Sequence, residues 1–239
     1  MGRLATIFGV LIALLVGAAL LSGPAPRADF VFLNRGDVST LDPSQMSWMQ
    51  DFRVATLLYE GLTRRDVQSA GYDPLPGMAE RWEVSPDGLV YTFHLRPATW
   101  TNGDPVTAHD FEWSFKRQLD PATQASYAAF LFDLKNAEAF NTKKEGITAD
   151  DVGAKAIDDL TLEITLEGPR GYFLTVLAYT AALPAHRGAV EKFGDKWTEP
   201  GNIVTNGPWK LTEWEHEKQL VYERNDDFIL EPKPKLRKL

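Results

Sequence analysis

Two stretches of the sequence alternate between apolar and polar residues. In 89–96, LVYTFHLR, and in 160–167, LTLEITLE, every second residue is a large apolar one. Successive side chains of a β-strand point to opposite faces, so a period of two predicts a strand with one buried face. The SPDG sequence at 85–88 supplies a turn before the first stretch, because proline presets φ and glycine accepts a positive φ. Both stretches are therefore predicted to be half-buried strands.

Apolar residues three and four positions apart predict helices elsewhere in the chain. The best defined helix follows a turn at Asn102-Gly103, where Thr107 is a good N-cap and Asp110 can return its hydrogen bond. Apolar residues then recur at positions 108, 111, 115 and 119, which lie on one side of a helix. Further predicted elements are helices over 52–62, 172–177 and 186–193, a hairpin over 209–222, and a strand over 30–33, FVFL, covered on both faces.

The first 28 residues have the pattern of a targeting segment. Arg3 provides the positive start, and residues 4–21 are apolar without a charge. This run is longer than the roughly 7–15 residues of a usual signal sequence and close to the lower limit for a membrane span. Residues 1–28 are thus either a cleaved signal peptide or a membrane anchor through 4–21. Both interpretations place the rest of the chain in the periplasm or on the outer face of the cytoplasmic membrane.

The composition excludes several functions. The 239-residue chain has no cysteine, so disulfides and thiolate chemistry are excluded, and its net charge of −8 argues against a nucleic acid partner. The four histidines lie far apart without a second ligand nearby, which predicts no metal site. No phosphate-binding loop, nucleophile elbow or zinc-protease motif occurs, and no nucleophile and base can be paired for an exported hydrolase. We expect no catalytic residue, no cofactor and no enzymatic activity.

Trp48 is the aromatic residue with the strongest indication of a binding role. It lies in 36–52, GDVSTLDPSQMSWMQDF, a stretch rich in turn formers between a predicted strand and a predicted helix. Aromatic residues in exposed loops often line binding sites. Packing in the core remains an open alternative for Trp48. It is the favoured interpretation for the tryptophans at 82, 100, 113 and 209.

Several longer motifs occur in one order along the chain. They are TLDP at 40–43, YEGLTRRD at 59–66, AERW at 79–82 followed by SPDGLVYTFHLRPATWTNGDPVTAHDF at 85–111, DPATQASYAAFL at 120–131, VGAKAIDDLTLEITLEGP at 152–169 and EKFGDKWTEPGNIVTNGPWKL at 191–211. Together they resemble the extracytoplasmic solute-binding proteins of peptide ABC importers, family 5, and above all its oligopeptide-binding members. The resemblance covers about residues 30–230.

This resemblance implies an α/β fold of the periplasmic binding protein type, in the peptide-binding class of type II. Family members have two lobes that close on a ligand. Residues 29–59 and 187–239 would form the first lobe around a mixed sheet, and 60–186 would form a small α+β domain inserted into it. Family members are much longer than this chain, and the second lobe has no counterpart in it.

The resemblance also implies a ligand and the residues that contact it. The segment Ser47-Trp48-Met49 matches the part of the family whose main chain pairs with a bound peptide as an added strand, and Tyr127 matches a family aromatic residue near the peptide. The implied function is capture of oligopeptides and delivery to the permease subunits of an ABC transporter, by a monomer. Family relatives bind nickel complexes, haem or other small solutes, so these ligands stay open.

The length of the chain leaves another function open. A membrane-tethered interaction or sensory module, or a degenerate half-receptor, would also have the long apolar segment at 4–21 and half of a receptor fold.

Overall fold

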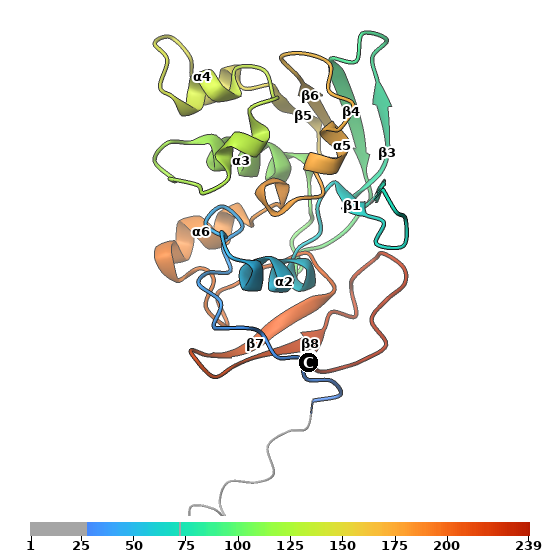
Figure 1. Ribbon diagram of the computed structural model, residues 1–239, viewed down its shortest axis with the longest axis vertical. Coiled ribbons are helices and arrows are strands. Elements are labelled where there is room, and N and C mark those ends of the chain that lie inside the picture. Colours follow the sequence, from blue (N-terminus) through green and yellow to red (C-terminus); the bar gives the residue numbers. More distant parts are fainter. Residues whose placement is uncertain (1–27, 72) are drawn as a thin grey trace, which may run out of the picture.

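The computed structural model describes residues 28–71 and 73–239 (Figure 1). The expected targeting segment at 1–28 therefore lies almost entirely outside the described residues. Within the described ranges, no helix combines the length and the apolar character that a membrane crossing needs.

A four-stranded antiparallel sheet lies on the right side of the upper half of the molecule in Figure 1. Its order is β3 (Ala79–Val84), β4 (Val90–Leu95), β6 (Thr161–Thr165) and β5 (Ala154–Asp158). The two alternating stretches form the central pair, in which Phe93 lies opposite Leu162. Both of these side chains are fully buried, and Tyr91, Leu95 and Ile164 on the same face are buried as well. The two predicted half-buried strands are confirmed.

Helix α3 (Ala108–Leu119) covers this sheet on the β5 and β6 side. Its start has the predicted reciprocal cap, because the Thr107 N–H donates to Asp110 Oδ2 at 2.7 Å. Phe111, Phe115 and Leu119 are fully buried at the predicted spacing. An N-cap fixes where a helix begins and an apolar stripe fixes which side it buries. Local sequence therefore determined this element.

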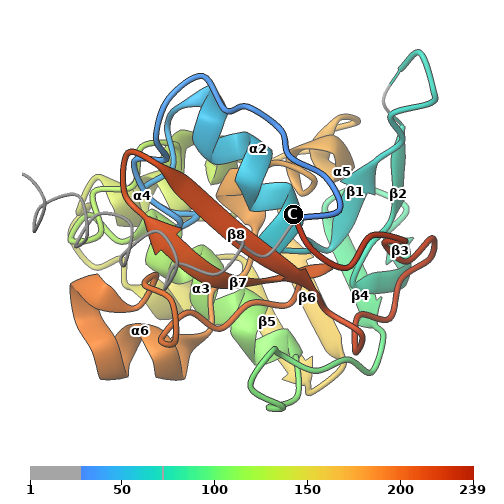
Figure 2. The ribbon, with the colours of Figure 1, turned by 90° about the horizontal axis from the view of Figure 1, so that it is seen from below.

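A hairpin and a helix form the lower half of the molecule. The predicted hairpin is present as β7 (Trp209–Glu215) paired with β8 (Gln219–Arg224), and α2 (Met49–Leu58) packs against β7 (Figure 2). The remaining elements are β1 (Thr63–Arg65), β2 (Pro74–Pro76), α4 (Ala137–Asn141), α5 (Phe173–Val176), α6 (Arg187–Phe193) and the 3₁₀ turns η1 (Ala128–Leu131), η2 (Ala149–Asp151), η3 (Thr180–Ala182) and η4 (Gly194–Lys196).

Two predicted elements differ in the structure. The run 30–33 forms no strand: Phe30, Val31 and Leu33 are 53%, 73% and 91% exposed, and Phe32 alone packs inward. A strand needs neighbours for its backbone groups, and no strand of the described chain pairs with this run. The helix predicted over 52–62 is present as Met49–Leu58. It begins three residues earlier and ends four residues earlier than predicted.

The buried apolar residues form two clusters. One draws its members from 62–182 and surrounds the four-stranded sheet, and the other draws them from 38–59 and 185–222 and lies around α2 and the hairpin. This division follows the expected boundaries near 60 and 186, although folding of 60–186 as a separate domain stays a prediction. Polar contacts that join the clusters include the ion pair Asp42–Arg117 and the amide contact Glu60–Asn206.

Candidate ligand-binding site

A buried carboxylate organises the loop that carries the predicted site. Asp51, in the first turn of α2, is fully buried. Its oxygens accept from the N–H of Ser39 at 2.8 Å, the Ser39 hydroxyl at 2.6 Å, the N–H of Trp48 at 3.2 Å and the N–H of Ser47 at 3.4 Å. A carboxylate at the third helical position that accepts from the N-cap N–H stabilises the start of a helix. The loop before α2 is thereby tied to the helix at both of its ends.

Ser47, Trp48 and Met49 lie at the junction of this loop and α2. Trp48 is the N-cap and Met49 is the first helical residue, so the helix begins three residues earlier than predicted. The side chains of Trp48 and Met49 are 61% and 66% exposed, which is unusual for such large apolar groups. The structure thus presents the tryptophan as a surface residue and not as part of the core.

The main chain at this junction is largely used within the protein. The N–H groups of Ser47 and Trp48 donate to Asp51, and the Trp48 carbonyl accepts from the N–H groups of Asp51 and Phe52 at 3.0 and 3.1 Å. The Ser47 carbonyl accepts a long hydrogen bond of 3.5 Å from the Tyr127 hydroxyl. Pairing of this segment with a ligand strand stays a prediction, and the Ser47 carbonyl is the main-chain group best placed for it.

The structure brings Tyr127 to this junction although it lies 80 residues further along the chain. The turn before it is held against the loop by two contacts. Gln45 Nε2 donates to the Thr123 carbonyl at 2.5 Å, and the Ser126 N–H donates to the Ser44 carbonyl at 3.3 Å. The two parts of the predicted site therefore meet.

Three further aromatic residues surround Tyr127. Phe52, Phe130 and Tyr179 have ring centroids 5.8, 5.5 and 5.9 Å from that of Tyr127. Phe130 and Tyr179 are stacked at 4.6 Å with an angle of 9° between their planes. We call these four residues the aromatic cluster. Phe130 remains 39% exposed, and the other three are half-buried, so the cluster presents ring surface to solvent.

Sequence reasoning missed three members of this cluster. Phe52 falls in a helical pattern and reads as core, Phe130 lies in a short 3₁₀ turn, and Tyr179 comes from a segment with no clear period. The one available signal was the DPATQASYAAFL motif, which contains both Tyr127 and Phe130.

Electrostatics distinguish Tyr179 within the cluster. Burial raises the pKa of the Tyr179 hydroxyl, the nearby Tyr127 raises it further, and the positive charge of Arg65 opposes both. The guanidinium carbon of Arg65 lies 5.5 Å from the Tyr179 ring centroid, within the range of a cation–π contact. The site accordingly combines aromatic faces, two phenol hydroxyls and one cation.

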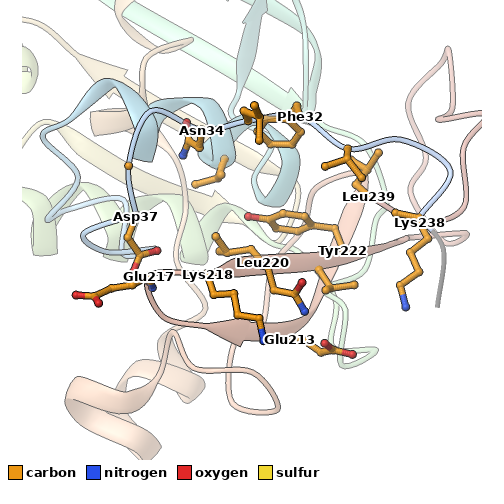
Figure 3. Close-up of a pocket in the computed structure, with 17 residues that line it drawn as sticks. Phe32, Asn34, Asp37, Glu213, Glu217, Lys218, Leu220, Tyr222, Lys238 and Leu239 are labelled. Atoms are coloured by element: carbon orange, nitrogen blue, oxygen red, sulfur yellow. Dashed lines mark hydrogen bonds between the residues drawn. The ribbon is translucent and has the colours of Figure 1, made fainter. Parts of the chain in front are cut away.

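Three cavities lie away from this surface. One of 550 Å³ separates the 31–37 segment from the β7–β8 hairpin (Figure 3), one of 440 Å³ lies beside β5, and one of 370 Å³ lies beside Asp42. None of the three is lined by the predicted site residues or by the aromatic cluster. Figure 3 shows Phe32, Tyr222 and Leu239 lining the first cavity, with the charged residues at its rim. These three cavities are therefore distinct from the candidate site.

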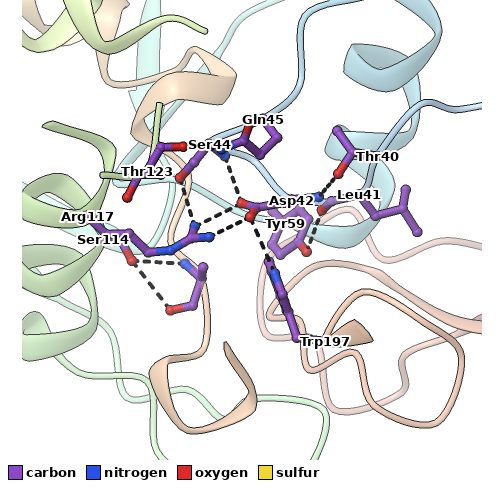
Figure 4. Close-up of polar contacts among 11 residues, drawn as sticks. Thr40, Leu41, Asp42, Ser44, Gln45, Tyr59, Ser114, Arg117, Thr123 and Trp197 are labelled. Carbon is purple, nitrogen blue, oxygen red and sulfur yellow. Dashed lines mark hydrogen bonds and ion pairs between the residues drawn. The ribbon is translucent and has the colours of Figure 1, made fainter. Parts of the chain in front are cut away.

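A polar network beneath the site joins α3 to the loop before α2 (Figure 4). Arg117 donates from both terminal nitrogens to the Asp42 carboxylate, at 2.9 and 2.5 Å, and from one of them to the Ser44 hydroxyl at 2.9 Å. Trp197 Nε1 approaches the same carboxylate at 3.4 Å, and the Tyr59 hydroxyl donates to the Leu41 carbonyl at 2.9 Å. This network holds the loop before α2 against α3.

Two of the histidines make local contacts within the fold. His186 is the N-cap of α6, because its Nδ1 accepts from the Ala189 N–H at 3.0 Å. His94 lies 3.2 Å from a Glu83 oxygen on the polar side of the sheet. In residues 28–71 and 73–239 no three histidine, aspartate or glutamate side chains gather in the way a metal ion requires.

Several known proteins are similar to this chain in sequence and fold. The chain is 40% identical over 230 residues to the periplasmic oligopeptide-binding protein of Salmonella typhimurium, covering 92% of this chain and 41% of that protein. The solved structure of OppA from Burkholderia pseudomallei superposes with a TM-score of 0.78 at 36% identity, covering 84% of this chain and 39% of that one. Haemophilus influenzae OppA in complex with RPPGFSPFR superposes with a TM-score of 0.75 at 36% identity, covering 80% and 37%.

These similarities define the class as extracytoplasmic binding proteins with a periplasmic peptide-binding fold. Residues 73–239 match the family described as bacterial extracellular solute-binding proteins, family 5. The chain belongs to this family, whose matched relatives are binding proteins and not enzymes. The chain spans about 41% of the length of the curated relatives first matched, and the part that corresponds to their second lobe lies outside it.

Proposed function

We propose that this chain is the N-terminal part of the receptor component of an ABC importer and that it captures oligopeptides outside the cytoplasmic membrane for delivery to the permease. The observation that carries the proposal is the exposed aromatic surface around Tyr127, joined to the Ser47 carbonyl at 3.5 Å. The peptide complex of the similar Haemophilus influenzae protein supports the same ligand class. On this proposal the chain acts as a monomer without a cofactor.

The surface suits a ligand whose side chains vary. Aromatic rings provide apolar contact area without requiring one particular partner, and the phenol hydroxyls of Tyr127 and Tyr179 add polar contacts. Main-chain groups such as the Ser47 carbonyl recognise what all peptides share. Trp48 and Met49 extend the apolar surface beyond the cluster and would contact the ligand from the α2 side.

Binding of peptides by the 239-residue chain tests the proposal directly. We expect isothermal titration with a mixture of three- to five-residue peptides to give measurable binding. Tyr127→Ala should weaken it about three- to tenfold, the range reported for one aromatic contact. Tyr172→Ala is the matched control, because Tyr172 is 55% exposed and lies outside the aromatic cluster.

The alternatives predict other results. A membrane-tethered interaction module would bind no peptide and would co-sediment with lipid vesicles through residues 4–21. A nickel complex or haem as ligand would give binding that peptides do not compete. Equal affinities of the wild type and Tyr127→Ala for peptide would show that the aromatic cluster does not contribute to peptide binding.

A further inference from the structure

Arg65 points toward the aromatic cluster because of its place on a short hairpin. Alternate residues of β1 point to opposite sides. Thr63 faces α5, where its hydroxyl donates to the Leu174 carbonyl at 2.8 Å, and Arg64 faces the other side, where Nη2 donates to the Glu231 carbonyl at 3.0 Å. Arg65 shares the side of Thr63, and its guanidinium carbon lies 5.5 Å from the Tyr179 ring centroid.

The charge of Arg65 has no acidic partner in the described part of the chain. None of the ion pairs within residues 28–71 and 73–239 includes it, and its side chain is exposed. The adjacent Asp66 uses its carboxylate for the Gln68 N–H at 2.8 Å.

Tyr179 connects this cation to the rest of the site. It stacks on Phe130 and meets Tyr127 edge-on, and Tyr127 in turn reaches the Ser47 carbonyl. The guanidinium therefore lies at the Tyr179 side of the same surface that receives a peptide in the proposed function. Contact with the ring limits the freedom of the side chain and leaves its N–H groups available.

We propose that Arg65 forms a carboxylate-binding subsite, which selects peptides that bring either an acidic side chain or their terminal carboxylate to Tyr179. The inference rests on the proposed function, since it concerns the same surface. Arginine suits this role because its planar fork can donate two parallel hydrogen bonds to one carboxylate. Peptides that place a neutral side chain there would bind through the aromatic faces alone.

Paired peptides test the subsite on the full chain. Tetraalanine is compared with variants that carry Glu or the isosteric Gln at each position, and with the C-terminal amide of each. We expect Glu to bind about two- to fivefold more tightly than Gln at one position, which is the range for an exposed ion pair. If the terminal carboxylate is the ligand, amidation weakens binding by a similar factor and the position of Glu has no effect on affinity.

Arg65→Gln should abolish the preference for a carboxylate. Arg81→Gln is the matched control, because Arg81 is an exposed arginine on β3 that pairs with Glu83. Peptide binding without any preference for a carboxylate, or a preference that survives Arg65→Gln, would overturn the subsite while the proposed function stands. Failure of every peptide to bind would overturn the proposed function, and the subsite with it.

Discussion

Glu60 provides a sensitive test of the packing between the two clusters. The chain passes at this residue from one cluster to the other, and Asn206 holds its backbone on both sides, at 3.0 Å to its N–H and 2.9 Å to its carbonyl. The side chain is 9% exposed. Burial raises the pKa of the Glu60 carboxyl from 4.5 to about 7, and the charge of Arg64 opposes this increase only in part.

The raised pKa predicts how stability depends on pH. Between about pH 4.5 and 7 the folded state holds a proton that the unfolded state has lost, so the free energy of unfolding falls as the pH rises. Each pH unit in this interval costs about 1.4 kcal/mol, which gives about 3 kcal/mol over the whole interval. Stability is greatest below the unfolded pKa and is lost as pH rises through the folded one. Glu60→Gln keeps the volume and removes the titration.

Urea unfolding of the wild type and Glu60→Gln at pH 5, 6, 7 and 8, followed by tryptophan fluorescence, measures the effect. The variant should have nearly the wild-type stability at pH 5 and exceed it by about 3 kcal/mol at pH 8. Glu80→Gln, at an exposed glutamate of β3, controls for the loss of a charge. A difference between wild type and Glu60→Gln that stays constant from pH 5 to 8 would refute a buried, proton-retaining carboxyl.

Two other substitutions test single contacts. Asp42→Asn leaves Arg117 without its ion-pair partner at a nearly buried position and should lower the free energy of unfolding by about 3 kcal/mol in urea. Glu83→Gln, in an exposed pair, should cost less than about 1 kcal/mol, and similar costs for the two would contradict the argument. Gly207→Ala adds a methyl group that overlaps the main chain at the end of α2 and should destabilise by at least about 2 kcal/mol. Gly36→Ala, with open space around it, should leave the thermal midpoint unchanged.

Elements determined by neighbouring residues could be predicted from the sequence. Phe93 and Leu162 alternate with polar residues, and each strand buries the predicted face. Thr107 and Asp110 form their cap within one turn of helix. Such patterns depend on backbone geometry alone, so they need no knowledge of distant parts of the chain.

The strand predicted at 30–33 and most of the site depend on distant residues. An apolar run becomes a strand where another strand offers hydrogen bonds, and nothing within the run indicates whether one does. Tyr179 follows Tyr127 by 52 residues, and nothing in their local sequences shows that the rings meet at 5.9 Å. The family resemblance identified Tyr127, but only the folded structure shows which aromatic residues surround it.

The contacts of Asp51 have a consequence for the energetics of capture. One buried carboxylate holds four donors between Ser39 and Trp48, so the segment that carries the candidate site is already immobilised before any ligand arrives. A loop that had to order on binding would lose conformational entropy, which weakens affinity. Here that loss occurs during folding. On the proposed function, weak and interchangeable contacts with many different peptides can then suffice for useful affinity, because they do not have to offset the ordering of the loop.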